Sequence, residues 1–200
     1  MIRLRCYAKL NLSLDITGKR PDGYHELDGI MQSISLSDTV EIERADGITT
    51  TFDVPDVDPV SNTAYAAARA FFDHTGIPGG ANIRIIKRIP RMSGLGGASA
   101  NAAAVLVGLN RLYGANLDGQ TLAGLGVKIG ADVPFALLGG TARARGIGEV
   151  LRPLRLKTPL YAVVVKPRAG VPTAEAFRRY RASAPLSISM VEFALMKGDI

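Results

Sequence analysis

Residues 90–104 read Pro-Arg-Met-Ser-Gly-Leu-Gly-Gly-Ala-Ser-Ala-Asn-Ala-Ala-Ala, a glycine-rich turn that runs directly into an alanine-rich helical segment. Gly94, Gly96 and Gly97 have no Cβ, so they can adopt positive φ and let a bulky anion approach the main chain. We expect a helix to begin near Ser99, with its unpaired first-turn N–H groups and positive dipole end facing the turn. The stretch predicts a phosphate-binding loop, although ordinary tight connections use the same residue types.

Two common phosphate-binding motifs do not occur in the sequence. There is no Gly-x-x-x-x-Gly-Lys-Ser/Thr, and no Gly-x-Gly-x-x-Gly follows an expected strand. Residues 90–104 instead resemble the second signature of the GHMP small-molecule kinases, the family of galactokinase, homoserine kinase and mevalonate kinase. In that family the loop wraps the phosphates of ATP. The resemblance implies that ATP is bound by Pro90, Arg91, Met92, Ser93, Gly94, Leu95, Gly96, Gly97, Ala98, Ser99 and Ala100.

The composition is that of an ordinary globular protein. The chain has 200 residues, of which 47% are hydrophobic and 21% are charged. No apolar run approaches membrane-spanning length, and the first residues lack the apolar core of a signal peptide. Cys6 is the single cysteine and only two histidines occur, which argues against a disulfide framework or a Cys/His metal cluster. We therefore expect a cytoplasmic protein without membrane contact.

The formal net charge of +6 is compatible with two kinds of partner. A basic balance suits a nucleic-acid-binding domain, and it also suits an enzyme whose substrates carry several phosphate charges. The Lys and Arg residues are spread along the chain, aromatic residues make up 6%, and Trp is missing. These features favour small anionic substrates over nucleic acid.

A strand is expected over residues 8–16, where apolar and polar residues alternate. The period of two puts Lys9 and Asn11 on the same face, and a solvated polar face would explain that arrangement. However, residues 7–12, Tyr-Ala-Lys-Leu-Asn-Leu, resemble the first GHMP signature. The resemblance implies that Lys9 is catalytic and that Asn11 binds substrate.

Two further segments are similar to one branch of the family, whose substrate is a cytidyl diphosphate sugar alcohol. Residues 18–27 form a loop rich in turn residues. By resemblance, Tyr24 in this loop stacks on the cytosine and His25 forms hydrogen bonds to the base. Residues 167–177 match the segment whose Phe forms the other wall of the base slot, which would be Phe177. A plain core position explains Phe177 equally well.

Asp132 has two compatible interpretations. It stands two residues before Pro134, ahead of an apolar run, which is typical of a helix N-cap. Residues 130–134, Gly-Ala-Asp-Val-Pro, also look like a string of the same branch in which the Asp is the catalytic carboxylate. The resemblance therefore implies that Asp132 is catalytic together with Lys9, and that Ser99 approaches Mg²⁺.

The other patterns predict an α+β fold with helices on one face of a sheet. Strands at 31–36, 39–44 and 49–54 suggest an antiparallel meander, and later strands are expected through Ile83, Ile85 and Ile89, at 141–145, at 150–154 and at 160–165. Helices are expected from Asn62 or Ser61 to Gly76, over 102–112, from Asp118 to about Lys128 and over 174–180, and residues 188–196 form a further amphipathic segment.

The resemblance covers nearly the whole chain and implies a GHMP kinase fold. Residues 1–153 would form the N-terminal, ribosomal-protein-S5-domain-2-like, ATP-binding domain, and residues 154–200 the start of an incomplete ferredoxin-like domain. The third GHMP signature is missing, so the chain looks C-terminally truncated.

The implied reaction transfers the γ-phosphoryl group of ATP, with Mg²⁺, to the 2-hydroxyl of the cytidyl diphosphate sugar alcohol in isoprenoid synthesis. The implied enzyme is a monomer or homodimer. Another GHMP kinase, a catalytically impaired ATP-binding fragment and a basic nucleic-acid-binding domain remain alternatives.

Overall fold

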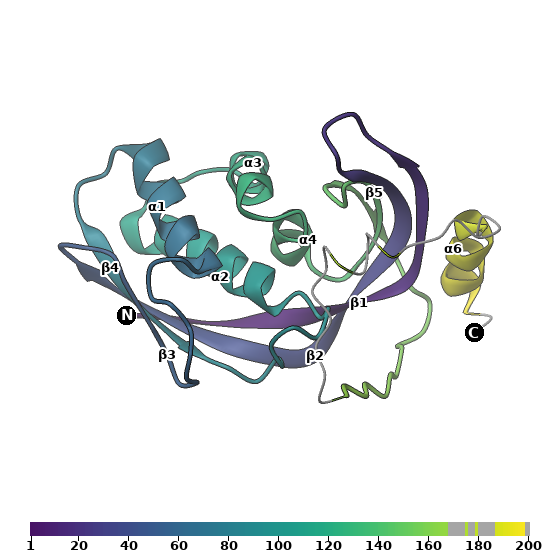
Figure 1. Ribbon diagram of the computed structural model, residues 1–200, viewed down its shortest axis with the longest axis horizontal. Coiled ribbons are helices and arrows are strands. Elements are labelled where there is room, and N and C mark those ends of the chain that lie inside the picture. The colour runs from purple at the N-terminus through teal and green to yellow at the C-terminus, as the bar shows by residue number, and fades with distance from the viewer. Residues whose placement is uncertain (168–174, 176–178, 180–186, 199–200) are drawn as a thin grey trace.

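A computed structural model describes residues 1–167, 175, 179 and 187–198. Its framework is a hairpin of two long strands, β1 (Ile2–Lys19) and β2 (His25–Ala45), drawn in purple and blue in Figure 1. The hairpin turn is closed by a hydrogen bond of 2.7 Å from Arg20 N–H to the Tyr24 carbonyl. The strand predicted over 8–16 is therefore confirmed as the middle of a longer strand.

β2 is continuous where two separate strands were expected, at 31–36 and 39–44. Ser37-Asp38 reads as a break in the sequence because both residues favour turns. In the structure Asp38 is completely buried, and its carboxylate accepts hydrogen bonds from the Lys87 ammonium and from the N–H groups of Arg88 and Ile89. These donors all come from residues 87–89 and not from the neighbours of Asp38 in the chain. The carboxylate therefore does not stabilise a turn, and the strand continues through Asp38.

β2 organises a sheet that has six strands in the described part of the chain. β1 pairs with it antiparallel from Ile2↔Ile42 to Lys19↔His25. The C-terminal part of β2 pairs antiparallel with β4 (Gly80–Ile86), and its N-terminal part pairs antiparallel with β5 (Thr141–Gly146). β6 (Val150–Leu154) continues the sheet beside β5.

The expected meander is wrong at β3 (Thr49–Phe52), which pairs parallel with β4 at the edge of the sheet. Parallel neighbours need a crossover connection, and α1 (Thr63–Thr75) supplies it between the two strands. The side chain of Asn62 caps this helix by accepting a hydrogen bond of 2.9 Å from Tyr65 N–H, as the sequence predicted.

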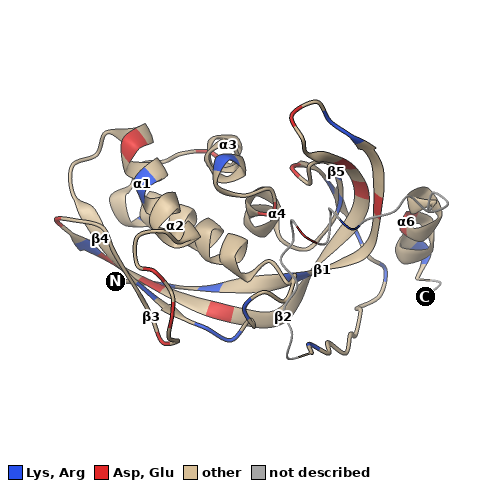
Figure 2. Ribbon diagram, viewed as in Figure 1, with Lys and Arg blue, Asp and Glu red and all other residues tan. Residues whose placement is uncertain are grey.

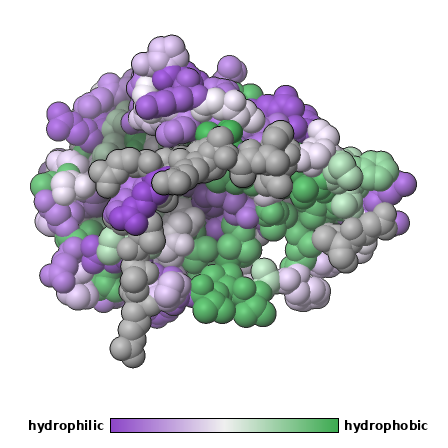
Figure 3. Space-filling view, turned by 45° about the vertical axis from the view of Figure 1, so that its right-hand side comes forward, coloured by the Kyte–Doolittle hydropathy of each residue, from purple (hydrophilic) through white to green (hydrophobic). Residues whose placement is uncertain are grey.

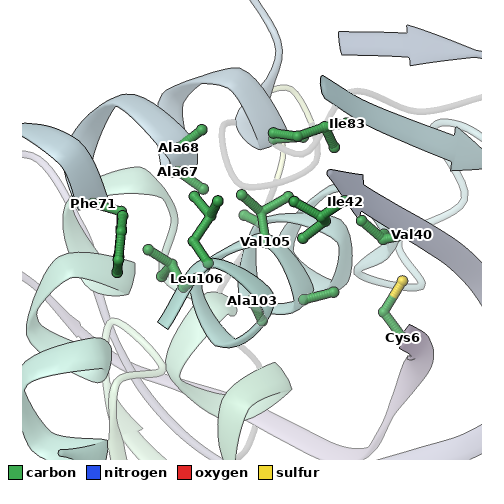
Figure 4. Packing of buried hydrophobic residues seen from close by; sticks show 14 of the residues in the cluster. Cys6, Val40, Ile42, Ala67, Ala68, Phe71, Ile83, Ala103, Val105 and Leu106 are labelled. Atoms are coloured by element: carbon green, nitrogen blue, oxygen red, sulfur yellow. The ribbon is translucent and has the colours of Figure 1, made fainter. Parts of the chain in front are cut away.

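The helices that follow β3 and the glycine-rich turn cover one face of the sheet (Figure 1), which confirms the α+β class. They are α1, α2 (Gly97–Tyr113), α3 (Gly119–Ile129) and α4 (Val133–Leu138). The long helix α2 lies between α1 and the sheet strands (Figure 4), and the core there includes Ala67, Phe71, Val40, Ile42, Val105 and Leu106. Full burial of a large apolar side chain contributes about 1.5–3 kcal/mol, so α2, and with it the glycine-rich turn, is firmly held.

The chain beyond β6 differs from expectation. The strand predicted at 160–165 is wrong, since these residues pair with no strand in the described part of the chain. An apolar run becomes a strand only where a neighbour completes the hydrogen-bond ladder. α6 (Ile188–Lys197) forms from the amphipathic segment at 188–196. The helix expected over 174–180, with Phe177, lies outside the described residues apart from positions 175 and 179.

No helix among the described residues has the length and apolar character needed to cross a membrane.

Candidate active site

The glycine-rich loop is tied to two other parts of the chain. The backbone N–H of Lys9 donates a hydrogen bond of 2.9 Å to the backbone carbonyl of Leu95, which joins the loop to β1. The Arg91 guanidinium donates at 3.0 Å to each of the Pro55 and Asp56 carbonyls. These bonds fix the position of the loop relative to β1 and to residues 55–56.

The loop has the backbone that its glycines predict. Gly94 and Gly96 have φ values of 73° and 71°, in the left-handed region that favours glycine. Gly96 is the N-cap of α2, and no side chain caps this helix end. The helix begins at Gly97, two residues before the expected start. Its first turn therefore presents main-chain N–H groups and a positive dipole end toward the loop, which is a suitable environment for an anion.

Lys9 and Asp132 meet beside this loop. The Lys9 ammonium lies 3.3 Å from Asp132 Oδ2 and donates a hydrogen bond of 3.2 Å to Asn11 Oδ1. The Lys9 side chain is 10% exposed and the Asp132 side chain 30%, so the ammonium is shielded from solvent while the carboxylate is partly open to it. Lys9 and Asn11 do project from the same face of β1, as the alternation predicts.

Asp132 occupies the N-cap position of α4, but its side chain forms no capping hydrogen bond. Its backbone has φ −84° and ψ −7°, which is αR rather than the extended conformation usual at a cap. The carboxylate points instead to the Lys9 ammonium, a stronger partner than a neutral N–H group. The prediction of a cap is therefore wrong for the side chain, although the position in the chain is right.

Gly96 brings the loop into contact with the ion pair. A Cβ added at Gly96 would lie 2.9 Å from Lys9 Cγ and 3.8 Å from Asp132 Oδ2. The first distance is shorter than real Cβ contacts, so only glycine fits without displacing Lys9. The main chain of the glycine-rich loop and the two charged groups thus form one continuous surface.

This surface is the wall of a cavity of about 1030 Å³. The cavity is lined by Lys9, Asn11, Asp132, every loop residue from Pro90 to Ser99, and the start of α1. Ala100, the last residue of the predicted ATP-binding stretch, is buried and does not line it. Tyr24 and His25 also lie outside the lining. They sit at the β1–β2 turn, where Tyr24 is 58% exposed. Phe177 lies outside the described residues.

A buried polar cluster under the loop was not predicted. It consists of Asp38, Lys87 and Asn101, and the last two line the cavity. In the amide orientation in which both the nitrogen and the oxygen of Asn101 have partners, the nitrogen donates to Asp38 Oδ2 at 2.9 Å and the oxygen accepts from the Lys87 ammonium at 3.3 Å. A signal was present in the sequence, because Lys87 interrupts an apolar strand three residues before Pro90. Its partner Asp38 is 49 residues away and could not be found by local spacing.

Two other kinds of chemistry have little support in the described structure. Burial raises the pKa of the Cys6 thiol to about 12, so this thiol is a poor nucleophile near neutral pH. Lys and Arg residues are scattered over many elements rather than gathered on one face (Figure 2), which does not resemble a nucleic-acid footprint. The arrangement instead suits transfer of a phosphoryl group, which needs mainly positioning and neutralisation of charge.

Comparisons with known proteins agree with this geometry. A family model described as the GHMP kinases N terminal domain matches residues 62–140. The chain is 51% identical to the 4-diphosphocytidyl-2-C-methyl-D-erythritol kinase of Carboxydothermus hydrogenoformans, over 86% of this chain and 60% of the relative. It is 40% identical to the kinase of the same name from Symbiobacterium thermophilum, over 99% of this chain and 72% of the relative.

A crystal structure of 4-(cytidine 5'-diphospho)-2C-methyl-D-erythritol kinase superimposes with a TM-score of 0.82 at 40% identity. The match covers 98% of this chain and 72% of the crystallised one. The chain spans less than two thirds of the length of relatives such as the Carboxydothermus protein, of which it covers 60%.

Proposed function

Because this chain belongs to the family of 4-diphosphocytidyl-2-C-methyl-D-erythritol kinases, a branch of the GHMP kinases, we propose that it phosphorylates the 2-hydroxyl of 4-diphosphocytidyl-2-C-methyl-D-erythritol with ATP. This reaction belongs to the methylerythritol phosphate pathway of isoprenoid synthesis. The observation that carries the proposal is the Lys9–Asp132 pair, 3.3 Å apart and in contact with Gly96 of the glycine-rich loop.

Asp132 is the proposed base. Its carboxylate accepts the proton of the 2-hydroxyl while that oxygen forms a bond to the γ-phosphorus and the bond to the β,γ-bridging oxygen breaks, so that ADP leaves. Lys9 lies between Asp132 and Asn11 and stabilises the negative charge that develops on the hydroxyl oxygen. Asn11 holds the ammonium in place through its hydrogen bond.

The ATP phosphates are assigned to the stretch from Pro90 to Ala100, chiefly to its main-chain N–H groups. The uncapped first turn of α2 supports this assignment, because it offers donors and a positive dipole end to an anion. Lys87 and Asn101 line the same cavity from below the loop.

Ser99 is the residue proposed to hold Mg²⁺. It lies in the first turn of α2 and lines the cavity, so its hydroxyl oxygen is a suitable hard ligand. The described residues contain no group of three or more His, Cys, Asp or Glu that could hold a metal ion. Mg²⁺ commonly takes one or two protein ligands and completes its shell with water and substrate phosphates, so this donor set fits. Bound Mg²⁺ would neutralise phosphate charge.

Tyr24 and His25 are the proposed cytosine-binding residues, with Phe177 as the opposite wall. Since neither Tyr24 nor His25 lines the cavity, the cytidyl end of the substrate must extend from the cavity to the β1–β2 turn. An aromatic face can stack on the base, and an imidazole can form hydrogen bonds to its edge.

Tyr24→Ala tests this assignment. It should raise the KM for the cytidyl substrate about tenfold, because base stacking is worth about 1–3 kcal/mol, and leave the KM for ATP unchanged. Steady-state kinetics with each substrate varied in turn measures both constants. An equal rise in the two KM values would remove Tyr24 from the base site.

The proposed reaction is tested by incubating the purified chain with ATP, Mg²⁺ and 4-diphosphocytidyl-2-C-methyl-D-erythritol, then measuring ADP and the 2-phosphate product. Parallel assays with homoserine and mevalonate test the other GHMP kinases. ATP binding without product would favour the catalytically impaired fragment. We propose a cytoplasmic location, because all the substrates are highly charged metabolites, and a monomer or homodimer, which light scattering would distinguish.

A further inference from the structure

The cavity wall changes from polar to apolar along the β1–β2 hairpin. Lys9 and Asn11 line the cavity beside the glycine-rich loop, whereas Leu14 and Ile16 line it closer to the hairpin turn. With a strict period of two, residues 14 and 16 would face away from residues 9 and 11. The register shifts between Asn11 and Ser13, where β1 has one residue more than β2, and such a bulge turns the following side chains to the other face. The hairpin thus places an apolar wall directly after its polar groups.

Met31 of β2 is the residue of this apolar wall that is paired with the polar groups. It lines the cavity and stands opposite Asn11 in the β1–β2 ladder, so the two side chains lie on the same face of the sheet. Asn11 in turn accepts the hydrogen bond from the Lys9 ammonium, which pairs with Asp132. Met31 is buried and packs against Phe135 of α4. Its position beside the reacting pair is therefore fixed from both sides.

The turn between β5 and β6, residues 146–149, adds a second apolar side chain at the same place. Ile147 lines the cavity, and its backbone N–H donates a hydrogen bond of 2.6 Å to Glu149 Oε2, which fixes the turn. A Cβ added at Gly148 would lie 3.4 Å from Met31 Cε and 3.9 Å from the Ala131 carbonyl oxygen. The turn therefore packs beside Met31 and beside the residue that precedes the proposed base.

The proposed acceptor has one group that matches this wall. Its carbon 2 carries the reacting hydroxyl and also a methyl group, whereas the rest of the acceptor chain carries oxygen on every carbon. With the hydroxyl at Asp132, the methyl group on the same carbon must lie close to the adjoining wall, where removal of apolar surface from water is favourable. We infer that Met31 and Ile147 form the binding site of this methyl group and select a tertiary alcohol over the secondary alcohol that lacks it. This inference rests on the proposed function.

The test compares two ligands that differ only in the methyl group, 4-diphosphocytidyl-2-C-methyl-D-erythritol and 4-diphosphocytidyl-D-erythritol. Calorimetric titration of the full chain gives a Kd for each. We expect the parent chain to bind the methylated alcohol about tenfold more tightly, which is the lower end of the discrimination that one carbon provides in an apolar pocket. Met31→Ala and Ile147→Ala should each reduce this ratio, because each removes part of the methyl contact. Met31→Leu keeps an apolar side chain of similar volume and should retain the ratio.

Val57→Ala is the matched control, because Val57 lines the same cavity from the segment between β3 and α1 and should not affect the ratio. Ile147 is only partly buried, so Ile147→Ala keeps the test decisive if thermal unfolding shows that Met31→Ala does not fold. If the parent chain binds both alcohols equally well, or if folded alanine variants keep the ratio, the inference is overturned and the proposed function stands. If the parent chain binds neither alcohol, both fail.

Discussion

The two regions of the chain bury their apolar residues to very different extents. In residues 1–153, large side chains such as Phe71, Ile42 and Leu106 are completely inaccessible to solvent. In the described residues after 153, Tyr161 and Val163 are almost fully exposed, and Met190, Phe193 and Met196 of α6 are exposed as well. Figure 3 shows hydrophobic surface on the side of the molecule that carries α6. The first region thus has its own hydrophobic core, and the described part of the second region buries apolar side chains mainly by packing against the first.

What joins the regions is a small apolar contact and a charged network. Ile188 and Leu195 of α6 pack on Ile30 and Leu154. Beside them the Arg143 guanidinium, which is almost buried, bonds to Asp28 of β2 at 2.6 Å and to Glu192 of α6 at 3.0 Å. The Arg152 guanidinium also donates a hydrogen bond of 2.6 Å to the Glu192 carboxylate. We propose that residues 1–153 and 154–200 are two domains, of which the first contains both reacting groups.

Replacing Asp132 is the strongest test of that division. Asp132→Asn removes the proposed base from the first region but keeps the shape of the side chain, so turnover should fall by about 10²–10⁴-fold, the usual contribution of general base catalysis. ATP binding should persist, because the loop is unchanged. Single-turnover assays and ATP titration measure the two effects. Full activity would place the base elsewhere and would contradict the assignment of the reacting groups to the first region.

Gly96→Ala tests the contact between loop and ion pair. The residue has a φ of 71°, and its new Cβ would lie 2.9 Å from Lys9 Cγ, so Lys9 must move. Displacement of a reacting group by about 1 Å costs on the order of 10²-fold in rate. Gly124→Ala in α3 is the matched control, since nothing lies within 4 Å of its Cβ. It should leave turnover unchanged, and a loss of similar size there would mean that the effect of Gly96→Ala is not local.

The difference between the regions also explains which sequence predictions succeed. The glycine-rich turn, the caps at Asn62 and Asp118 and the shared face of Lys9 and Asn11 are local features, set by residues within a few positions of one another. They appear in the structure as predicted. The close approach of Lys9 and Asp132 is a contact over more than a hundred residues, and it was expected only through the family resemblance.

The failures all concern partners that are distant in the chain. The sequence near Asp38 predicts a turn, because the contact of Asp38 with Lys87 is not visible in local sequence. β3 was predicted as the next strand of a meander, because local sequence does not show that the connection through α1 places it parallel to β4. Residues 160–165 read as a buried strand because they are apolar, yet no described strand lies beside them. The local sequence pattern indicates which secondary structure a segment favours, whereas strand pairing depends on which other segments lie beside it in the fold.

The charged network should make the junction between the regions sensitive to acid. The hydrogen bond from Arg143 lowers the pKa of Asp28, and the hydrogen bonds from Arg152 and then Arg143 lower the pKa of Glu192. A carboxyl whose pKa is lower in the folded state stabilises that state above its unfolded pKa, about 4 for these residues. This stabilisation is lost as the pH falls below about 4, through the lowered folded values.

Urea unfolding at pH 7 and pH 3 measures the effect, with Glu192→Gln as the comparison. The parent chain should lose more stability on acidification than the variant, because the variant has no charge to lose at position 192. Carboxyl groups elsewhere titrate in both proteins and cancel in the difference. Identical losses would show that the network does not hold α6 to the first region.

The smallest effect is expected on the exposed segment, and a matched pair of valines measures it. Val105 of α2 is 0% exposed and Val163 is 94% exposed. Val105→Thr buries a hydroxyl in an apolar core and should cost about 1–3 kcal/mol in the free energy of unfolding. Val163→Thr should change it by less than about 0.5 kcal/mol, because its side chain already faces solvent. A comparable loss at both positions in urea unfolding would mean that residues 160–165 are covered in solution, and that the second region is as well packed as the first.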